Sequence, residues 1–252
     1  MADGIELRRA TALVAAARRG VAFTGAGVSA ESGIQTFRGQ DGLWKRHDPY
    51  RTASLQHFLR DPSVYWAVSR ERWPGFQRAR PNPAHLALAE LELAGHLAAV
   101  VTQNTDGLHR EAGSRRVIEL HGTGGTVRCL DCGTSEPRAD VQARLDREMP
   151  PRCPACGGRR MKPTVVFFGE GLPSGAIEEA FELAGACDLM LVVGSTLVVY
   201  PAADVPRVAV QHGAPLVVLN DEPTPMDGRA TVVLRGRAGE LLPSLASSVL
   251  RA

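Results

Sequence analysis

The cysteines carry the clearest chemical pattern in the sequence. Four of the five form two C-x-x-C pairs, Cys129 with Cys132 and Cys153 with Cys156, and about 20 residues separate the pairs. Each pair can form a tight turn that points two thiolates at one tetrahedral ion, so the spacing predicts a zinc ribbon. Because four thiolates leave no coordination position open, we expect the zinc to be structural. Redox cysteines or a chance pattern are the alternatives, and Cys187 is expected to be a core residue.

A second pattern is a glycine-rich turn after a short apolar run. Residues 25–30 read G-A-G-V-S-A and fit G-x-G-x-x-A. Gly25 and Gly27 would allow a tight turn and a close approach of backbone N–H groups to a pyrophosphate at a helix N-terminus. A turn of small residues without a ligand is the alternative. The acidic residue that dehydrogenases place about 20 positions later has no credible counterpart, so a dinucleotide would bind in another way.

Strands and helices are predicted to alternate along the rest of the sequence, and they must position these groups. Short β-branched runs predict buried parallel strands at residues 21–24, 98–102, 188–193, 215–219 and 230–234. The clearest helix has Asn82 as N-cap and Pro83 at its first position, and it stops at Gly95. An amphipathic helix is expected within residues 1–19. This alternation predicts an α/β fold with a doubly wound parallel sheet.

Polar or small residues follow four of these strands. The groups are Gly25-Ala26-Gly27, Gln103-Asn104-Thr105-Asp106, Gly194-Ser195-Thr196 and Asn220-Asp221. Because ligands of open α/β sheets bind outside the carboxyl ends of the strands, we expect these groups to line one cleft.

Two segments interrupt the alternation. Residues 124–162 contain both cysteine pairs with several prolines and glycines, and residues 38–80 carry most of the large aromatic residues. We therefore predict a Rossmann-like domain from residues 1–37, 81–123 and 163–252. Residues 38–80 are predicted to form a helical module or cofactor-covering segment, and residues 124–162 a zinc-binding module.

Composition narrows the class of protein. The chain has 252 residues and a formal net charge of +2 without a block of basic residues, so nucleic-acid binding is not expected. No apolar run approaches the roughly 18 residues that span a membrane, and residues 1–19 lack the long apolar core of a signal peptide. We expect a soluble, cytoplasmic protein without membrane contact.

His121 lies between an apolar segment and Gly122. A lone histidine in such a place is usually structural. The other six histidines show no metal-ligand spacing, and we give them the same interpretation.

Several motifs, in this order, resemble the sirtuin family of NAD-dependent protein-lysine deacylases. They are the residues 25–38 GAGVSAESGIQTFR, the residues 101–106 VTQNTD, Leu120-His121-Gly122, the two cysteine pairs, the residues 165–170 VVFFGE and Gly194-Ser195-Thr196. The resemblance covers residues 20–242. It implies a Rossmann-like domain, a small domain made of a zinc and a helical module, and a cleft between them for NAD and an acyl-lysine peptide.

The resemblance also implies roles for individual residues. The cofactor-binding residues would be Gly25, Ala26, Gly27, Phe37, Arg38, Gln103, Asn104, Asp106, Gly194, Ser195 and Asn220. Residues Val165, Phe167, Phe168, Gly169 and Glu170 would pair with the substrate peptide as an added strand, although an inert strand edge is the alternative. His121 would be the general base and Asn104 a second catalytic residue.

The reaction implied by the resemblance consumes NAD as a co-substrate. The acyl-lysine amide oxygen attacks C1′ of the ribose and nicotinamide leaves. A ribose hydroxyl activated by His121 then attacks the resulting imidate, and water releases lysine and O-acyl-ADP-ribose. An ordinary histidine pKa near 6.5 suits this proton transfer at neutral pH.

The sequence departs from the commonest family pattern at Gln35, Thr105 and Lys162. Thr105 replaces an aliphatic residue of the nicotinamide pocket, so nicotinamide inhibition is expected to change. Family members that prefer succinyl-lysine carry a Tyr-x-x-Arg pair. One alignment puts Ala67 and Arg70 at these positions and another puts Ser69 and Arg72, so the tyrosine is absent in both.

Deacetylation is therefore expected, with desuccinylation or broad deacylation as the alternative. A protein mono-ADP-ribosyltransferase and a non-catalytic NAD- or zinc-binding module are the rival functions. The oligomeric state and physiological substrates do not follow from the sequence.

Overall fold

The computed structural model describes residues 2–39 and 42–251, so residues 40 and 41 of the predicted helical module and the two terminal residues lie outside it. A six-stranded sheet with the order β3-β2-β1-β7-β8-β9 forms the centre of the larger domain, and neighbouring strands are parallel. Its strands are β1 (Gly20–Thr24), β2 (Leu97–Thr102), β3 (Val117–Glu119), β7 (Leu189–Val193), β8 (Leu216–Leu219) and β9 (Val232–Leu234). The predicted α/β fold is confirmed, and all five predicted strands form within two residues of their expected ends. β3 was not predicted as a strand.

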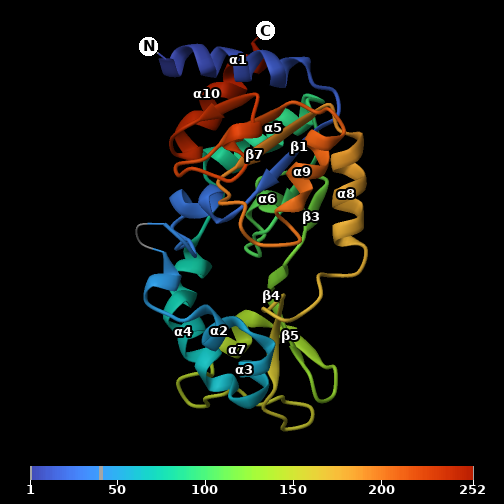
Figure 1. The fold of residues 1–252 in the computed structure, drawn as a ribbon. Coiled ribbons are helices and arrows are strands. Elements are labelled where there is room, and N and C mark those ends of the chain that lie inside the picture. Colours follow the sequence, from blue (N-terminus) through green and yellow to red (C-terminus); the bar gives the residue numbers. More distant parts are fainter. Residues whose placement is uncertain (1, 40–41, 252) are drawn as a thin grey trace.

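Helices cover both faces of this sheet (Figure 1). One face packs against α1 (Ala2–Ala16), α5 (Pro83–Leu93) and α10 (Ala238–Leu250), and the other packs against α8 (Ala176–Ala186) and α9 (Asp204–Gln211). Within β1, Ala22 joins the first core whereas Val21 and Phe23 join the second, because successive strand side chains point to opposite faces. Two buried cores explain why these strands are apolar along most of their length.

The predicted helix after Asn82 is confirmed as α5. The Asn82 side chain accepts a hydrogen bond from Ala84 N, and Pro83 occupies the first turn, where a missing N–H costs nothing. By contrast, the segment after β1 forms the 3-10 helix η1 (Ala26–Ser32), where an α-helix is usual in dinucleotide-binding units. The remaining short helices of the larger domain are α6 (Leu108–Glu111) and η3 (Asp227–Arg229).

The segment from residue 42 to 80 is helical. It contains η2 (Leu43–Lys45), α2 (Pro49–Ala53), α3 (Leu55–Arg60) and α4 (Pro62–Arg78). Asp48, Ser54 and Asp61 cap α2, α3 and α4 in turn, since each side chain accepts a backbone N–H of the following turn.

The cysteine-containing segment has its own three-stranded antiparallel sheet, with the order β5-β4-β6. It consists of β4 (Gly122–Cys129), β5 (Ser135–Pro137) and β6 (Met161–Val165), with α7 (Arg138–Gln142) beside it. This sheet shares a third apolar core with the helical segment, because Phe58 and Trp66 of α3 and α4 cluster with Val127 and Met161. The two small modules therefore pack as one unit below the larger sheet (Figure 1). The division of the chain at particular residues stays a prediction.

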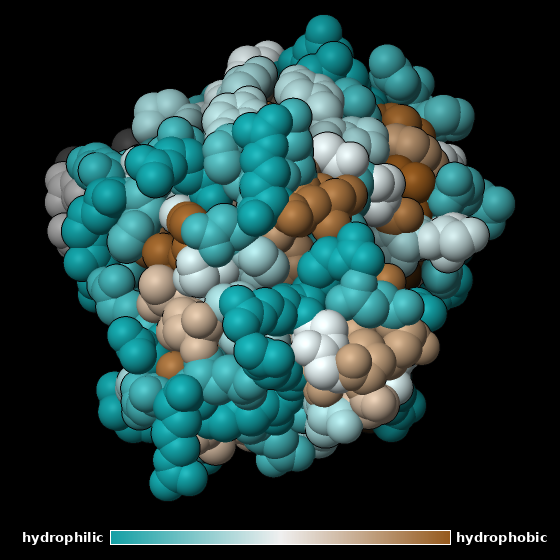
Figure 2. All heavy atoms as spheres, turned by 90° about the horizontal axis from the view of Figure 1, so that it is seen from below, coloured by the Kyte–Doolittle hydropathy of each residue, from teal (hydrophilic) through white to brown (hydrophobic). Residues whose placement is uncertain are grey.

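The surface of this lower end is mainly hydrophilic, with small hydrophobic areas among polar residues (Figure 2). Among the described residues, no helix is both long and apolar enough to cross a membrane.

Candidate active site

A cleft of about 1690 Å³ lies between the carboxyl edge of the large sheet and the two small modules. The strand order reverses between β1 and β7, and such a switch point is where open α/β sheets bind ligands. The cleft is lined by all predicted catalytic, cofactor-binding and substrate-binding residues, namely Gly25, Ala26, Gly27, Phe37, Arg38, Gln103, Asn104, Asp106, His121, Val165, Phe167, Phe168, Gly169, Glu170, Gly194, Ser195 and Asn220. The four paired cysteines lie outside it.

The loops after β1 and β7 touch directly at the switch point. Gly27 N donates to the Gly194 carbonyl at 2.8 Å, and a Cβ on Gly27 would lie 2.7 Å from the Gly194 Cα. Gly194 itself has φ +61, and a Cβ there would lie 2.3 Å from Val28 N. These glycines are therefore required for packing of the two loops as well as for any close approach of a phosphate.

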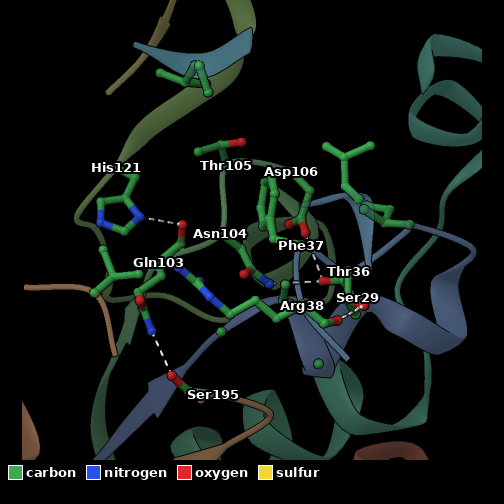
Figure 3. A pocket seen from close by; sticks show the side chains of 18 of the residues that line it. Ser29, Thr36, Phe37, Arg38, Gln103, Asn104, Thr105, Asp106, His121 and Ser195 are labelled. Carbon is green, nitrogen blue, oxygen red and sulfur yellow. Dashed lines mark hydrogen bonds between the residues drawn. The ribbon is translucent and has the colours of Figure 1, made fainter. Parts of the chain in front are cut away.

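His121 faces the cleft between the larger domain and the start of β4 (Figure 3). Its Nδ1 lies 3.0 Å from the backbone carbonyl of Gln103, which can only accept, so Nδ1 carries the hydrogen and Nε2 keeps a free lone pair. Burial lowers the pKa of His121 below the ordinary 6.5, and the bond to Gln103 opposes this shift. At neutral pH the imidazole is thus a neutral base with a fixed tautomer.

Gln103 and Ser195 connect the loops after β2 and β7. The Gln103 side-chain Nε2 donates to Ser195 Oγ at 2.8 Å, and Leu197 N donates to the same oxygen at 3.3 Å. Because Ser195 Oγ accepts both bonds, its hydroxyl hydrogen remains available to a ligand in the cleft.

The Ser29 hydroxyl organises the polar side chains after β2 (Figure 3). It accepts from Asn104 Nδ2 at 3.0 Å and donates to Asp106 Oδ2 at 2.7 Å. His85 Nδ1 accepts the Asn82 N–H, so His85 Nε2 is protonated and donates to Ser29 at 3.2 Å. Ser29 is 1% exposed, and all of its hydrogen-bonding capacity is used. The orientations of Asn104 and Asp106 are therefore fixed by a buried network.

A second buried chain supports the same loop from β1. His109 Nε2 lies 2.9 Å from Thr24 Oγ1, Thr24 donates to Thr102 Oγ1 at 2.8 Å, and Asn104 N donates to that oxygen at 3.0 Å. Burial lowers the pKa of His109 to about 3 and that of His85 to about 4. Both imidazoles are therefore uncharged at neutral pH and serve as structural hydrogen-bonding groups. Ser29, His85 and His109 were not among the expected site residues; the histidine at the third position of α5, three residues after the Asn82 cap, is the local signal that points to this network.

Phe37 stands at the mouth of the cleft. Its ring stacks on Trp44 with centroids 5.1 Å apart, and the Arg72 guanidinium lies 5.2 Å from its centroid. Phe37 is 39% exposed, so part of the side chain remains accessible to a ligand. Arg38 beside it is exposed.

The orientation of α4 distinguishes between the two alignments of the Tyr-x-x-Arg pair. Ala67 and Arg70 are exposed, and Arg70 pairs with Asp146 outside the cleft. Ser69 and Arg72 line the cleft, and Ser69 Oγ accepts a hydrogen bond from Arg138 Nη2 at 2.8 Å. The relevant register is thus Ser69 with Arg72.

Residues 165–170 line the cleft where the larger domain and the two small modules meet. Only Val165 belongs to a strand; Val166 N donates to His121 O at 2.9 Å, and Phe168 N donates to Ala53 O at 2.9 Å. The Phe167 ring is 3% exposed and packs in the core of the small modules. The Phe167 side chain is therefore largely closed to a bound peptide.

The four paired cysteines fit a tetrahedral zinc ion. Their Sγ atoms all lie within 4.8 Å of one another, with 3.7 Å between Cys129 and Cys156 and 3.6 Å between Cys132 and Cys153. A Zn–S bond of about 2.3 Å gives sulfur separations of about 3.8 Å in a tetrahedron. The zinc held by these four thiolates is structural, and the half-buried Cys187 lies elsewhere, after α8.

Comparison with known sequences gives a consistent result. The family model described as the Sir2 family matches residues 25–201. NAD-dependent protein deacylase 2 of Archaeoglobus fulgidus is 48% identical over 98% of this chain and 97% of its own length. NAD-dependent protein deacetylase of Caldivirga maquilingensis is 48% identical over 96% and 93%.

Solved structures agree with this. A Sir2 enzyme structure superposes with a TM-score of 0.92 at 47% identity, over 98% of each chain. A Sir2 variant bound to a deacetylated p53 peptide and 3′-O-acetyl ADP-ribose gives a TM-score of 0.91 at 37% identity, over 97% of each chain. The chain belongs to the Sir2 family, the sirtuin family of NAD-dependent protein-lysine deacylases.

Proposed function

We propose that the protein deacetylates lysine side chains of proteins and consumes NAD as co-substrate, through the residues gathered in the cleft. The observation that carries this proposal is the geometry of His121. A neutral imidazole with Nδ1 held by a backbone carbonyl presents Nε2 as a proton acceptor, in the same cleft as the side chains of Gln103 and Asn104. Family membership supports the reaction, and the tautomer of His121 supports its role as general base.

Each group has a separate task in this proposal. The backbone of the Gly25–Gly27 loop, Arg38, Ser195 and Asn220 bind the adenosine and phosphate side of NAD. Gln103, Asn104 and Asp106 orient the ribose and the carboxamide, since amides both donate and accept and a carboxylate accepts from an amide N–H. Phe37 covers the reacting sugar and excludes attack from its other face.

His121 then accepts the proton of a ribose hydroxyl at Nε2. The acyl group passes to the ribose, so the chemistry is acyl transfer to ADP-ribose, completed by addition of water. The backbone of the segment 165–170 holds the acyl-lysine peptide by main-chain hydrogen bonds, which gives affinity with little sequence selectivity. Its partners are therefore acyl-lysine proteins.

We further propose that acetyl is preferred to succinyl. Arg72 offers one cationic group to a succinyl carboxylate, but residue 69 is serine, which is 4% exposed and lacks the reach of a tyrosine hydroxyl. One missing charged hydrogen bond is worth roughly 1.5–3 kcal/mol, about tenfold to a hundredfold in kcat/KM. If succinyl is preferred instead, Tyr65 and Arg138 are the nearby cleft-lining groups that could supply the second contact.

A cytoplasmic location is also part of the proposal, because an all-thiolate zinc site suits a reducing compartment. Cell fractionation with an antibody against the protein tests this directly.

Product analysis tests the function itself. The protein, NAD and an acetylated peptide should yield nicotinamide, O-acetyl-ADP-ribose and unmodified lysine by mass spectrometry. A peptide that gains ADP-ribose and keeps its acetyl group would instead identify a mono-ADP-ribosyltransferase. Binding of NAD without any product would identify a non-catalytic module.

A further inference from the structure

Lys162 is nearly buried directly beneath the segment 165–170. Its Nζ donates to the carbonyl of Val165 at 2.7 Å, to that of Pro163 at 3.1 Å and to Glu170 Oε2 at 2.8 Å. The side chain is 7% exposed, and burial lowers the pKa of Lys162 while Glu170 opposes this shift. An ammonium group has three N–H donors, so all of its donors are used within a few residues of chain.

The same ion pair stabilises a tight turn. Glu170 N donates to Phe167 O at 3.0 Å, and Gly169 has φ +88, as the third residue of a type II turn requires. Phe167 N donates to Glu170 Oε2 at 2.7 Å, and the Lys162 ammonium lies 4.3 Å from the centre of the Phe167 ring. One carboxylate oxygen thus joins the buried ammonium to the turn.

The rest of the segment depends on other modules. Phe168 exchanges two backbone hydrogen bonds with Ala53 and Leu55, and Val166 N bonds to the His121 carbonyl. Within the described part of the chain, the amide and carbonyl of Gly169 make no hydrogen bond. The Gly169 edge is therefore free to pair with an extended peptide, and Lys162 with Glu170 sets the direction in which this edge points.

We propose that Lys162 is a positioning residue that holds residues 165–170 in the conformation that receives the acyl-lysine peptide. The inference rests on the proposed function. It assigns to Lys162 an effect on peptide binding, whereas a purely structural ion pair would affect stability alone. Because loss of one partner of a buried ion pair also destabilises the fold, the peptide KM and Tm are measured side by side, and only a change in the peptide KM is assigned to positioning.

The test uses Lys162→Met, which keeps the length of the side chain and removes the charge, and Lys162→Arg, which keeps the charge. Arg116→Met is the matched control, because Arg116 makes a 2.8 Å ion pair with Glu179 on the exposed side of the larger domain. For each variant, KM for an acetylated peptide, KM for NAD, kcat and Tm are measured.

We expect Lys162→Met to raise the peptide KM about tenfold, because the segment then spends most of its time in conformations that do not bind. KM for NAD and kcat at saturating peptide should stay within about twofold of the wild type. Lys162→Arg should give a smaller rise in the peptide KM, and Arg116→Met should give none.

Three results would overturn the proposal: an unchanged peptide KM with a lower Tm, an equal rise in both KM values, or a fall in kcat alone. If Lys162→Met does not fold, the peptide KM of Lys162→Arg decides by the same criteria. Failure of the wild-type protein to deacetylate any peptide would refute the proposed function, and this outcome is distinct from an active wild type with unaffected variants.

Discussion

Replacement of His121 by alanine is the sharpest test of the proposed chemistry. Among the described residues, the His121 side chain makes one hydrogen bond, from Nδ1 to a backbone carbonyl, so loss of the side chain should leave the cleft nearly intact. The Gln103 side chain is held independently by Ser195, and Asn104 by Ser29. His121→Ala should therefore bind NAD with near-normal affinity.

The expected loss of turnover is on the order of 10²–10⁴-fold, the usual contribution of a general base. This corresponds to about 3–5 kcal/mol of transition-state stabilisation. Single-turnover release of nicotinamide and of free lysine can be measured together with NAD binding by calorimetry. His212→Ala is the matched control, because His212 Nδ1 also bonds a backbone carbonyl, that of Val208 at 2.9 Å, outside the cleft.

The pH dependence provides a second measurement on the same residue. Only the neutral imidazole can accept a proton, and burial lowers the pKa of His121. Hence kcat/KM should fall as the pH drops, with a midpoint below 6.5, and it should stay level from there to neutral pH. Near-normal turnover of His121→Ala, or an acid midpoint above 6.5 for the wild type, would refute this role.

Three further predictions concern zinc, acid stability and acyl choice. Cys153→Ala should lower zinc content and Tm together, whereas Cys187→Ala should retain one zinc per chain; metal analysis and calorimetry check this, and a fully stable zinc-loaded Cys153→Ala contradicts it. Burial lowers the pKa values of His109 and His85 to about 3 and about 4 in the folded protein. Below pH 6.5 these two histidines therefore bind protons in the unfolded chain but remain neutral in the folded one. The free energy of unfolding, measured with urea, should therefore fall by on the order of 2–4 kcal/mol between pH 7 and pH 5, and by less in His109→Leu. A free energy of unfolding that does not change over this pH range would contradict this prediction. Ser69→Tyr should shift the ratio of desuccinylation to deacetylation toward succinyl by about tenfold or more, whereas Ala67→Tyr on the exposed side of α4 should not; faster desuccinylation by the wild type would contradict the reasoning.

Features that depend on short stretches of chain were predictable from the sequence. The C-x-x-C turns are local, because Gly133 N and Gly157 N each bond to the carbonyl of the first cysteine of their pair. Strands buried on both faces read as continuous apolar runs, so their positions followed directly. β3 (Val117–Glu119) escaped prediction because only two of its three residues are apolar, whereas the equally short β9 lies in the longer predicted run 230–234.

Orientation inside the cleft was not predictable, since its bonds join distant residues. Ser29 binds side chains at positions 85, 104 and 106, which are brought together only when β1 and β2 pair. One part of this network is nevertheless encoded locally. Because Asn82 N donates to His85 Nδ1 at the start of α5, His85 Nε2 must carry the hydrogen and can only donate to Ser29. A helix cap therefore determines which way the Ser29 hydroxyl points, and through Ser29 it fixes the Asn104 and Asp106 side chains that are proposed to hold the reacting ribose and carboxamide.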